Sequence, residues 1–210
     1  ISLGGVVKSK NLKIAGDRLN NDIITYMRDE FKILIGERTA ESIKIAIGAG
    51  VPGDVPMEAS VKGRDLVTGL PREVIITDSD IREAISQSID TLVEATKEVL
   101  ETTPPEVLSD VMNRGIYLCG GCALIRGLDQ VIGEYVKIPV HIAEDPLTTV
   151  ARGAGIILED LANLGYQREE LVPEKLRQRA AELTKRGSIL YSRPGQKVLR
   201  EIFAFVYRPV

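Results

Sequence analysis

The chain has 210 residues, 44% of them apolar and 27% charged, which is enough for one core or for two small subdomains. A formal net charge of −3 and an aromatic content of 4%, with no Trp, argue against nucleic acid as the main partner. Two cysteines are too few for a disulfide framework, and the sequence shows neither a signal-peptide pattern nor a membrane-spanning apolar run. We therefore expect a cytoplasmic protein with reduced thiols.

The N-terminal part predicts strands followed by two helices. Three short apolar runs are typical of strands: residues 1–3, 6–9 and 12–15. From Gly16-Asp17 onward, apolar residues recur at three- and four-residue spacing and predict a helix that ends at Gly36. Residues 37–47 begin with Glu, Arg and Ala and predict a second helix. Because the chain starts with Ile inside a strand-like run, we expect it to be a piece of a longer protein.

The central part predicts a hairpin and a long helix. Gly and Pro in residues 48–56 indicate a loop, and segments 57–64 and 73–76 predict the two strands of a hairpin. Residues 77–80 resemble a capping box, so we expect a long amphipathic helix to begin there. The Thr-Pro-Pro sequence at 103–105 is expected to end this helix.

The C-terminal part changes character along its length. A short helix is predicted over 106–113, a strand over 140–142, and a further helix from the Asp-Pro pair at 145–146. After about Gly165 the composition becomes basic, with ten Lys or Arg against five Glu in residues 166–210. We expect a charged extension there, and its aromatic end could contact anionic lipid.

The segment 115–129, GIYLCGGCALIRGLD, is the most informative part of the chain. Its apolar residues 116–118 predict a buried strand, Gly120-Gly121 a turn, and residues 123–128 a helix. A strand that turns through two glycines into a helix brings bare backbone and a helix N-terminus together. A flat or anionic ligand can then approach the main chain closely.

The same segment contains Cys119-x-x-Cys122, which permits a redox interpretation because a helix N-terminus lowers the pKa of a thiol. A zinc site would need further ligands, and His141 is the only histidine. The alternative is that Cys119 is a small residue at a strand end and Cys122 a small residue beside a ligand.

Common catalytic motifs do not occur in the sequence. A Walker A loop, a GxGxxG fingerprint and a G-x-S-x-G elbow are all missing. The carboxylates of Asp78 and Asp80 lie at a predicted helix start, where they stabilise the helix dipole. Glu41 and Lys44 lie three residues apart and share a helix face. They can form a surface ion pair, or they can hydrogen-bond a ribose beside a purine.

Six stretches carry a more specific signal: IAGD at 14–17, LIGERTAE at 34–41, LVTGLP at 66–71, TPPE at 103–106, LCGGCALIRGL at 118–128 and EDPLT at 144–148. In unbroken order over residues 1–161, the chain resembles the MreB family of bacterial actins. The family usually has Thr and Gly where this chain has Cys119 and Cys122.

The resemblance implies an α/β fold, namely the second half of an actin-like, RNase H-like domain with a small inserted α+β subdomain. Residues 1–16 and 101–164 would belong to the larger subdomain. Residues 17–100 would form the inserted subdomain, and residues 165–210 a basic C-terminal extension.

The resemblance also implies a site for the adenosine part of ATP. The two glycines and the cysteine at 120–122 would form the floor of the adenine pocket, with Ile125 against the base. Glu41 and Lys44 would face the ribose and adenine, and residues 16–17 would lie near the nucleotide at the interdomain cleft. The site would comprise Gly16, Asp17, Glu41, Lys44, Gly120, Gly121, Cys122 and Ile125.

The family binds ATP with Mg²⁺, and its phosphate loops and catalytic carboxylate precede the part that matches Ile1. We therefore expect no catalytic residue and no metal ligand here, and at most weak ATP binding by this chain alone. The whole protein would be an ATPase that forms head-to-tail filaments at the inner face of the cell membrane. It would maintain rod shape together with membrane proteins of wall synthesis.

Two alternatives from other classes remain at this stage. The chain could be an interaction module that binds a partner without any nucleotide function. It could also be a redox protein that uses Cys119 and Cys122.

Overall fold

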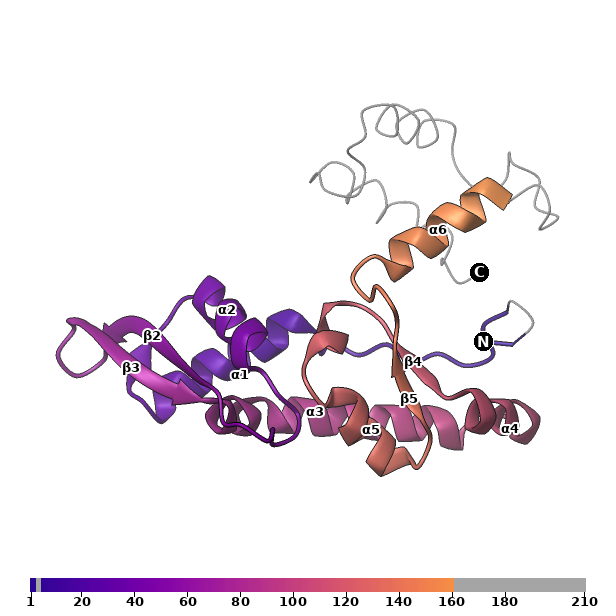
Figure 1. Ribbon diagram of the computed structural model, residues 1–210, viewed down its shortest axis with the longest axis horizontal. Coiled ribbons are helices and arrows are strands. Elements are labelled where there is room, and N and C mark those ends of the chain that lie inside the picture. Colours follow the sequence, from indigo (N-terminus) through magenta and orange to yellow (C-terminus); the bar gives the residue numbers. More distant parts are fainter. Residues whose placement is uncertain (3–4, 161–210) are drawn as a thin grey trace. The chain divides into compact units, whose positions relative to one another are not determined.

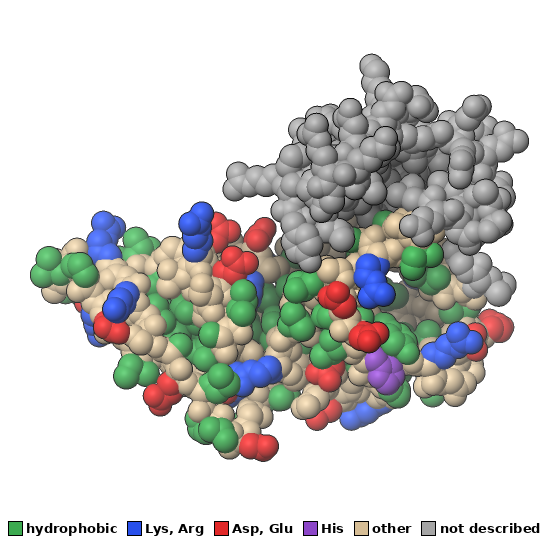
Figure 2. Space-filling model, turned by 45° about the horizontal axis from the view of Figure 1, so that its top comes forward, with side chains coloured by type: hydrophobic (Ala, Val, Ile, Leu, Met, Phe, Trp, Pro, Cys, Tyr) green, Lys and Arg blue, Asp and Glu red, His purple; other side chains and the backbone are tan. Residues whose placement is uncertain are grey.

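The computed structural model describes residues 1–2 and 5–160, with side chains to residue 156. Residues Ile1–Leu147 form one compact unit, and a second unit begins at Thr148 (Figure 1). The predicted basic extension, residues 165–210, lies outside the described residues. On the face that Figure 2 presents, acidic and basic side chains are interspersed with hydrophobic ones.

The first elements form a layer of two helices on a small antiparallel sheet. Helices α1 (Gly16–Asp29) and α2 (Glu37–Ile47) pack against each other. The sheet has the order β1-β2-β3, and its strands are β1 (Ile33–Leu34), β2 (Glu58–Asp65) and β3 (Pro71–Thr77). Strands β2 and β3 pair in register, with Val61 opposite Val74, and this confirms the predicted hairpin.

The long helix α3 (Asp78–Glu101) connects the two ends of the first unit (Figure 1). It contacts α1, α2 and β3 near its start and α5 further along. Its capping box is confirmed: the Asp80 N–H donates to Thr77 Oγ1 at 3.3 Å, and Asp80 Oδ2 accepts from the Thr77 N–H at 2.7 Å.

The remaining elements of the first unit form a β-α-β arrangement after a short helix, α4 (Pro105–Arg114). Strands β4 (Ile116–Leu118) and β5 (Val140–Ile142) pair in parallel, and α5 (Leu128–Val136) connects them. Between β4 and α5 lies a single 3₁₀ turn, η1 (Gly121–Leu124). The second unit begins with α6 (Thr149–Asp160).

One hydrophobic cluster extends through the first unit. It begins with the apolar face of α1, where Ile23 and Met27 are fully buried, and it includes Ile47 at the end of α2. It continues to Ile125 and Ile132, which both follow the glycine pair at 120–121. The end of α2 and the segment after β4 therefore share one core.

The helix predicted to reach Gly36 ends earlier, at Asp29. Lys32 has a φ of +54°, a left-handed conformation that a helix cannot continue through. Ile33 then joins β1 opposite Asp65 and is fully buried. Burial of Ile33 in the sheet decides this boundary, which spacing alone placed seven residues too late.

The three strands predicted before Gly16 do not form in residues 1–2 and 5–15, where an isolated bridge joins Ser2 and Gly5. A strand persists only when a neighbouring strand pairs with its N–H and C=O groups. Among the described strands, β4 pairs with β5 and not with the residues before Gly16. The segment is tied instead by the Lys10 ammonium, which pairs with Glu98 on α3.

Two helix starts also differ from the sequence expectation. The helix predicted over 123–128 is replaced by η1 and then by Gly127, which has a φ of +73° and precedes α5. The helix predicted from residues 145–146 begins at Thr149. The Pro146 carbonyl instead accepts from the Gly120 N–H at 2.6 Å, so it binds the segment 115–129, called the glycine segment below.

Candidate functional site

The backbone of the glycine segment is sterically open at Gly120, and a hydrogen bond holds this residue in place. Gly120 has a φ of +88°, and a Cβ added there would meet no atom within 4 Å. The Gly120 N–H is held by the Pro146 carbonyl at 2.6 Å, and a Cβ at the exposed Gly121 would touch Leu147 Cδ2 at 3.4 Å. A flat ligand could therefore approach the main chain of this turn closely.

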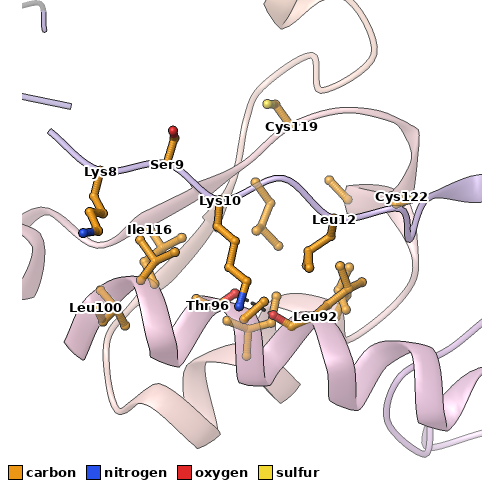
Figure 3. Close-up of a pocket in the computed structure, with 16 residues that line it drawn as sticks. Lys8, Ser9, Lys10, Leu12, Leu92, Thr96, Leu100, Ile116, Cys119 and Cys122 are labelled. Carbon is orange, nitrogen blue, oxygen red and sulfur yellow. Dashed lines mark hydrogen bonds between the residues drawn. The ribbon is translucent and has the colours of Figure 1, made fainter. Parts of the chain in front are cut away.

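The two cysteines lie on either side of the glycines as free thiols, Cys119 exposed and Cys122 half-buried. Both line a cavity of about 520 Å³ whose other walls come from β4, α3, α5 and residues 8–12. In Figure 3 the Cys119 sulfur points away from the α3 side chains. Within the described residues, no group of three His, Cys, Asp or Glu side chains could hold a metal ion.

Lys44 connects α2 to the beginning of α1. Its ammonium donates to the Asn20 side-chain oxygen at 2.7 Å and to the Gly16 carbonyl at 3.1 Å. A Cβ at Gly16 would lie 3.3 Å from the Lys44 nitrogen, so the glycine leaves room for this contact. Lys44 and Gly16 are thus brought together, whereas the carboxylates of Asp17 and Glu41 are exposed.

Contacts of Arg126, through its backbone and its side chain, join the end of α2 to the glycine segment. The Gly50 N–H donates to the Arg126 carbonyl at 2.7 Å, and Ala49 forms a parallel bridge with Arg126. The Arg126 guanidinium donates in turn to the Ile47 carbonyl at 3.2 Å. These contacts place the C-terminal end of α2, and the residues that follow it, next to Arg126.

Ile125 is 6% exposed and belongs to the core, which anchors the end of the turn. Asn20 and Arg126 complete the arrangement, and neither was singled out from the sequence. Asn20 follows Gly16 by four residues and shares its helix face, a spacing that could have indicated its role. Arg126 directly follows Ile125, but no sequence pattern predicts its contact with α2.

Shifted pKa values occur away from this arrangement. The backbone N–H of Met57, together with Arg82, lowers the pKa of Asp78 at the start of α3. Burial and the neighbouring Glu83 raise the pKa of Tyr26. Asp78 holds the start of α3 and Tyr26 bonds from α1 to Glu83 on α3, so both shifts arise from structural contacts. In the described part of the chain, no helix is long and apolar enough to cross a membrane.

The fold belongs to a known class. A crystal structure of MreB5 from Spiroplasma citri bound to AMPPNP is similar over 77% of this chain and 48% of that one, with a TM-score of 0.74 and 37% identity. A MamK double helical filament is similar over 70% of this chain and 45% of that one, with a TM-score of 0.59 and 21% identity. The chain therefore has an actin-like α/β fold, as the resemblance implied.

The family is equally well defined. The MreB/Mbl protein family matches residues 1–166, and the chain belongs to it. It is 44% identical over 164 residues to the cell shape-determining protein Mbl of Bacillus subtilis, covering 78% of this chain and 49% of that protein. It is 48% identical over 159 residues to the cell shape-determining protein MreB of Escherichia coli K12, covering 76% and 46%. The chain spans about half the length of these relatives.

Proposed function

We propose that this chain supplies the adenosine side of an ATP site in an actin-like cytoskeletal protein that maintains rod cell shape. The observation that carries this proposal is the junction between the end of α2 and residue Arg126. This junction joins the C-terminal end of the helix that carries Glu41 and Lys44 to the segment that follows Gly120 and Gly121. The MreB5 structures bound to AMPPNP and to ADP support the choice of nucleotide.

The exposed backbone and the hydrogen-bonding side chains of this site fit an adenosine. The open backbone of residues 120–122 offers a flat floor for a base, and the buried Ile125 keeps this floor in place. The exposed Glu41 carboxylate accepts hydrogen bonds from ribose hydroxyls, and Lys44 donates to them. Gly16 and Asp17, at the start of α1, are proposed to lie near the nucleotide as well.

The subdomains, the filament and the partners that we propose are those of the family. Residues 1–16 and 101–164 belong to the larger actin-like subdomain, residues 17–100 to the inserted one, and residues 165–210 to a basic extension. Copies of the whole protein associate head to tail into filaments at the inner face of the membrane, with cell-shape and wall-synthesis proteins as partners. An open head-to-tail contact of this kind produces filaments rather than closed rings.

Amide NMR of the ¹⁵N-labelled 210-residue chain tests the adenosine site, because it detects weak binding. Addition of ADP is expected to shift the amide signals of Gly16, Lys44 and residues 120–122. Inorganic triphosphate, which lacks the nucleoside, is expected to leave them in place. Shifts with triphosphate alone, shifts elsewhere, or no shift with ADP would refute the proposed site. If ADP causes no shift, and the chain assembles tightly whether or not ATP is present, an interaction module would be favoured.

A matched pair of variants sharpens this test. Glu41→Ala removes the exposed carboxylate expected to bind the ribose and should weaken ADP binding about tenfold, the usual effect of one charge-assisted hydrogen bond. Glu37→Ala changes an exposed carboxylate one turn earlier on α2 and should leave binding unchanged. Equal effects of the two substitutions would contradict a specific role for Glu41.

A further inference from the structure

Asn20 is a buried polar side chain whose partner is a proposed ligand-binding residue. It is 3% exposed, and its side-chain oxygen accepts from the Lys44 ammonium at 2.7 Å. The other buried polar residues of the described part have partners of other kinds. Asp65 and Asp78 bind backbone N–H groups, and Ser88 pairs with Asp22. Among these four, Asn20 is the one that bonds to a residue of the proposed nucleotide site.

The contact with Asn20 restricts a side chain that is otherwise flexible. An ammonium carries three N–H donors on a four-carbon stem with many rotamers. Two of the Lys44 donors are taken by Asn20 and by the Gly16 carbonyl, which lie one turn apart on α1. Two acceptors one turn apart fix the position of the nitrogen. Among the hydrogen bonds of the described residues, the third donor has no acceptor.

We infer that Asn20 is a positioning residue for ribose recognition. It holds the Lys44 ammonium in one place before the ligand arrives, so that the third N–H is available to a ribose hydroxyl. Binding then orders no lysine rotamers, which favours a ligand that offers an acceptor at that position. This inference rests on the proposed nucleotide function. Asn20 itself touches no ligand in this scheme and acts through Lys44.

Discrimination between ATP and 2′-deoxy-ATP is the readout that a merely structural role would not change. Titrations of the 210-residue chain, followed by the amide signals of residues 120–122, give both dissociation constants. We expect the wild type to prefer ATP severalfold and Asn20→Ala to bind both nucleotides about equally. Asn21→Ala, which removes an exposed amide one residue further along α1, should keep the preference. A preserved preference in folded Asn20→Ala would overturn the inference.

A conservative variant protects this test against loss of the fold. Asn20→Asp retains an acceptor for Lys44 and is expected to keep the preference for ATP, although its added charge weakens binding of both nucleotides. Loss of the preference in this variant, with amide signals that still show a native fold, would also overturn the inference.

Chemical labelling without nucleotide separates failure of Asn20 from failure of the proposed function. Acetic anhydride is expected to acetylate Lys44 several times faster in Asn20→Ala than in the wild type, measured against Lys62, whose side chain is 80% exposed. An unchanged Lys44 rate would show that Asn20 does not hold the lysine. Faster labelling in a chain that binds neither nucleotide would refute the nucleotide function and the ribose role with it, while preserving the contact.

Discussion

At the scale of single residues, Asp65 shows how one carboxylate organises a turn. It ends β2 and accepts from the backbone N–H groups of Val67 and Thr68 at 2.8 Å each, and from the Arg72 guanidinium at 3.0 Å. The two backbone N–H groups lower the pKa of Asp65 from 3.8 to about 2, with Arg72 adding to the effect. The turn therefore depends on the charged form of this side chain.

Protonation of Asp65 is expected to destabilise the hairpin in acid. Because the pKa is lower in the folded state than in the unfolded chain, the stabilisation is present above pH 4 and is lost as the pH falls toward 2. Asp65→Asn should lower the melting temperature at pH 7 and flatten its decline between pH 4 and pH 2. Thermal melts followed by circular dichroism measure both effects.

Asp54 provides the control for this prediction. It lies in an exposed part of the loop after α2, so Asp54→Asn should leave the acid dependence as in the wild type. A wild-type slope in Asp65→Asn, or an equally flat one in Asp54→Asn, would show that other carboxylates carry the acid sensitivity.

At the scale of elements, the junction between β3 and α3 is set by local chemistry. Thr77 is both the last residue of β3 and the N-cap of α3, and its side chain and the Asp80 carboxylate satisfy each other's backbone N–H groups. The Asp78 carboxylate accepts from the Met57 N–H at 3.2 Å and so joins the start of the helix to the start of β2. The first residues of α3 and of the hairpin strand β2 are therefore held together.

Thr77→Ala is expected to lower the free energy of unfolding by about 1 kcal/mol, the usual cost of losing an N-cap side chain. Urea unfolding followed by circular dichroism measures the change. Thr91→Ala, on an exposed face in the middle of α3, removes the same atoms without a capping role and should change stability little. Equal losses in both variants would mean that the cap contributes nothing specific.

At the scale of the first unit, the decisive feature is the contact between two segments far apart in sequence, residues 48–51 and 126–131. A Cβ at Gly50 would touch Val131 Cγ2 at 3.3 Å, and one at Gly127 would collide with Val51. Gly127 also has a φ of +73°, which side-chain-bearing residues rarely adopt. Glycines at these positions let the end of α2 reach the turn after β4.

Gly127→Ala is expected to cost about 1–3 kcal/mol of stability, because it adds backbone strain and a collision at this junction. Hydrogen exchange should quicken at the Gly50 amide, which bonds across the junction. The control is Gly53→Ala in the same loop, where a Cβ would find ordinary van der Waals space. Unchanged exchange at Gly50 in folded Gly127→Ala would show that the junction tolerates a side chain.

The sequence predicted those features that neighbouring residues determine. The hairpin, the capping box of α3, the helix over 37–47 and the strands at 116–118 and 140–142 depend on alternation, helical spacing and turn residues, and all of them form. The actin-like family also followed from sequence alone, because its motifs survive in order from IAGD to EDPLT. Such signals are local, so they can be recognised without the fold.

Tertiary contacts decided the rest. Pairing of Ile33 with Asp65 ended α1 early, and residues 5–15 stayed without strands because no described neighbour pairs with them along their length. The role proposed for Asn20 depends on where Lys44 of another helix places its ammonium, and the contact of Arg126 depends on the end of α2. The sequence determined the family and most elements, whereas only the packed chain joined Lys44 to Gly16 and the end of α2 to the glycine turn. Hydrogen bonds between residues 24 to 79 positions apart leave no periodic trace in a sequence.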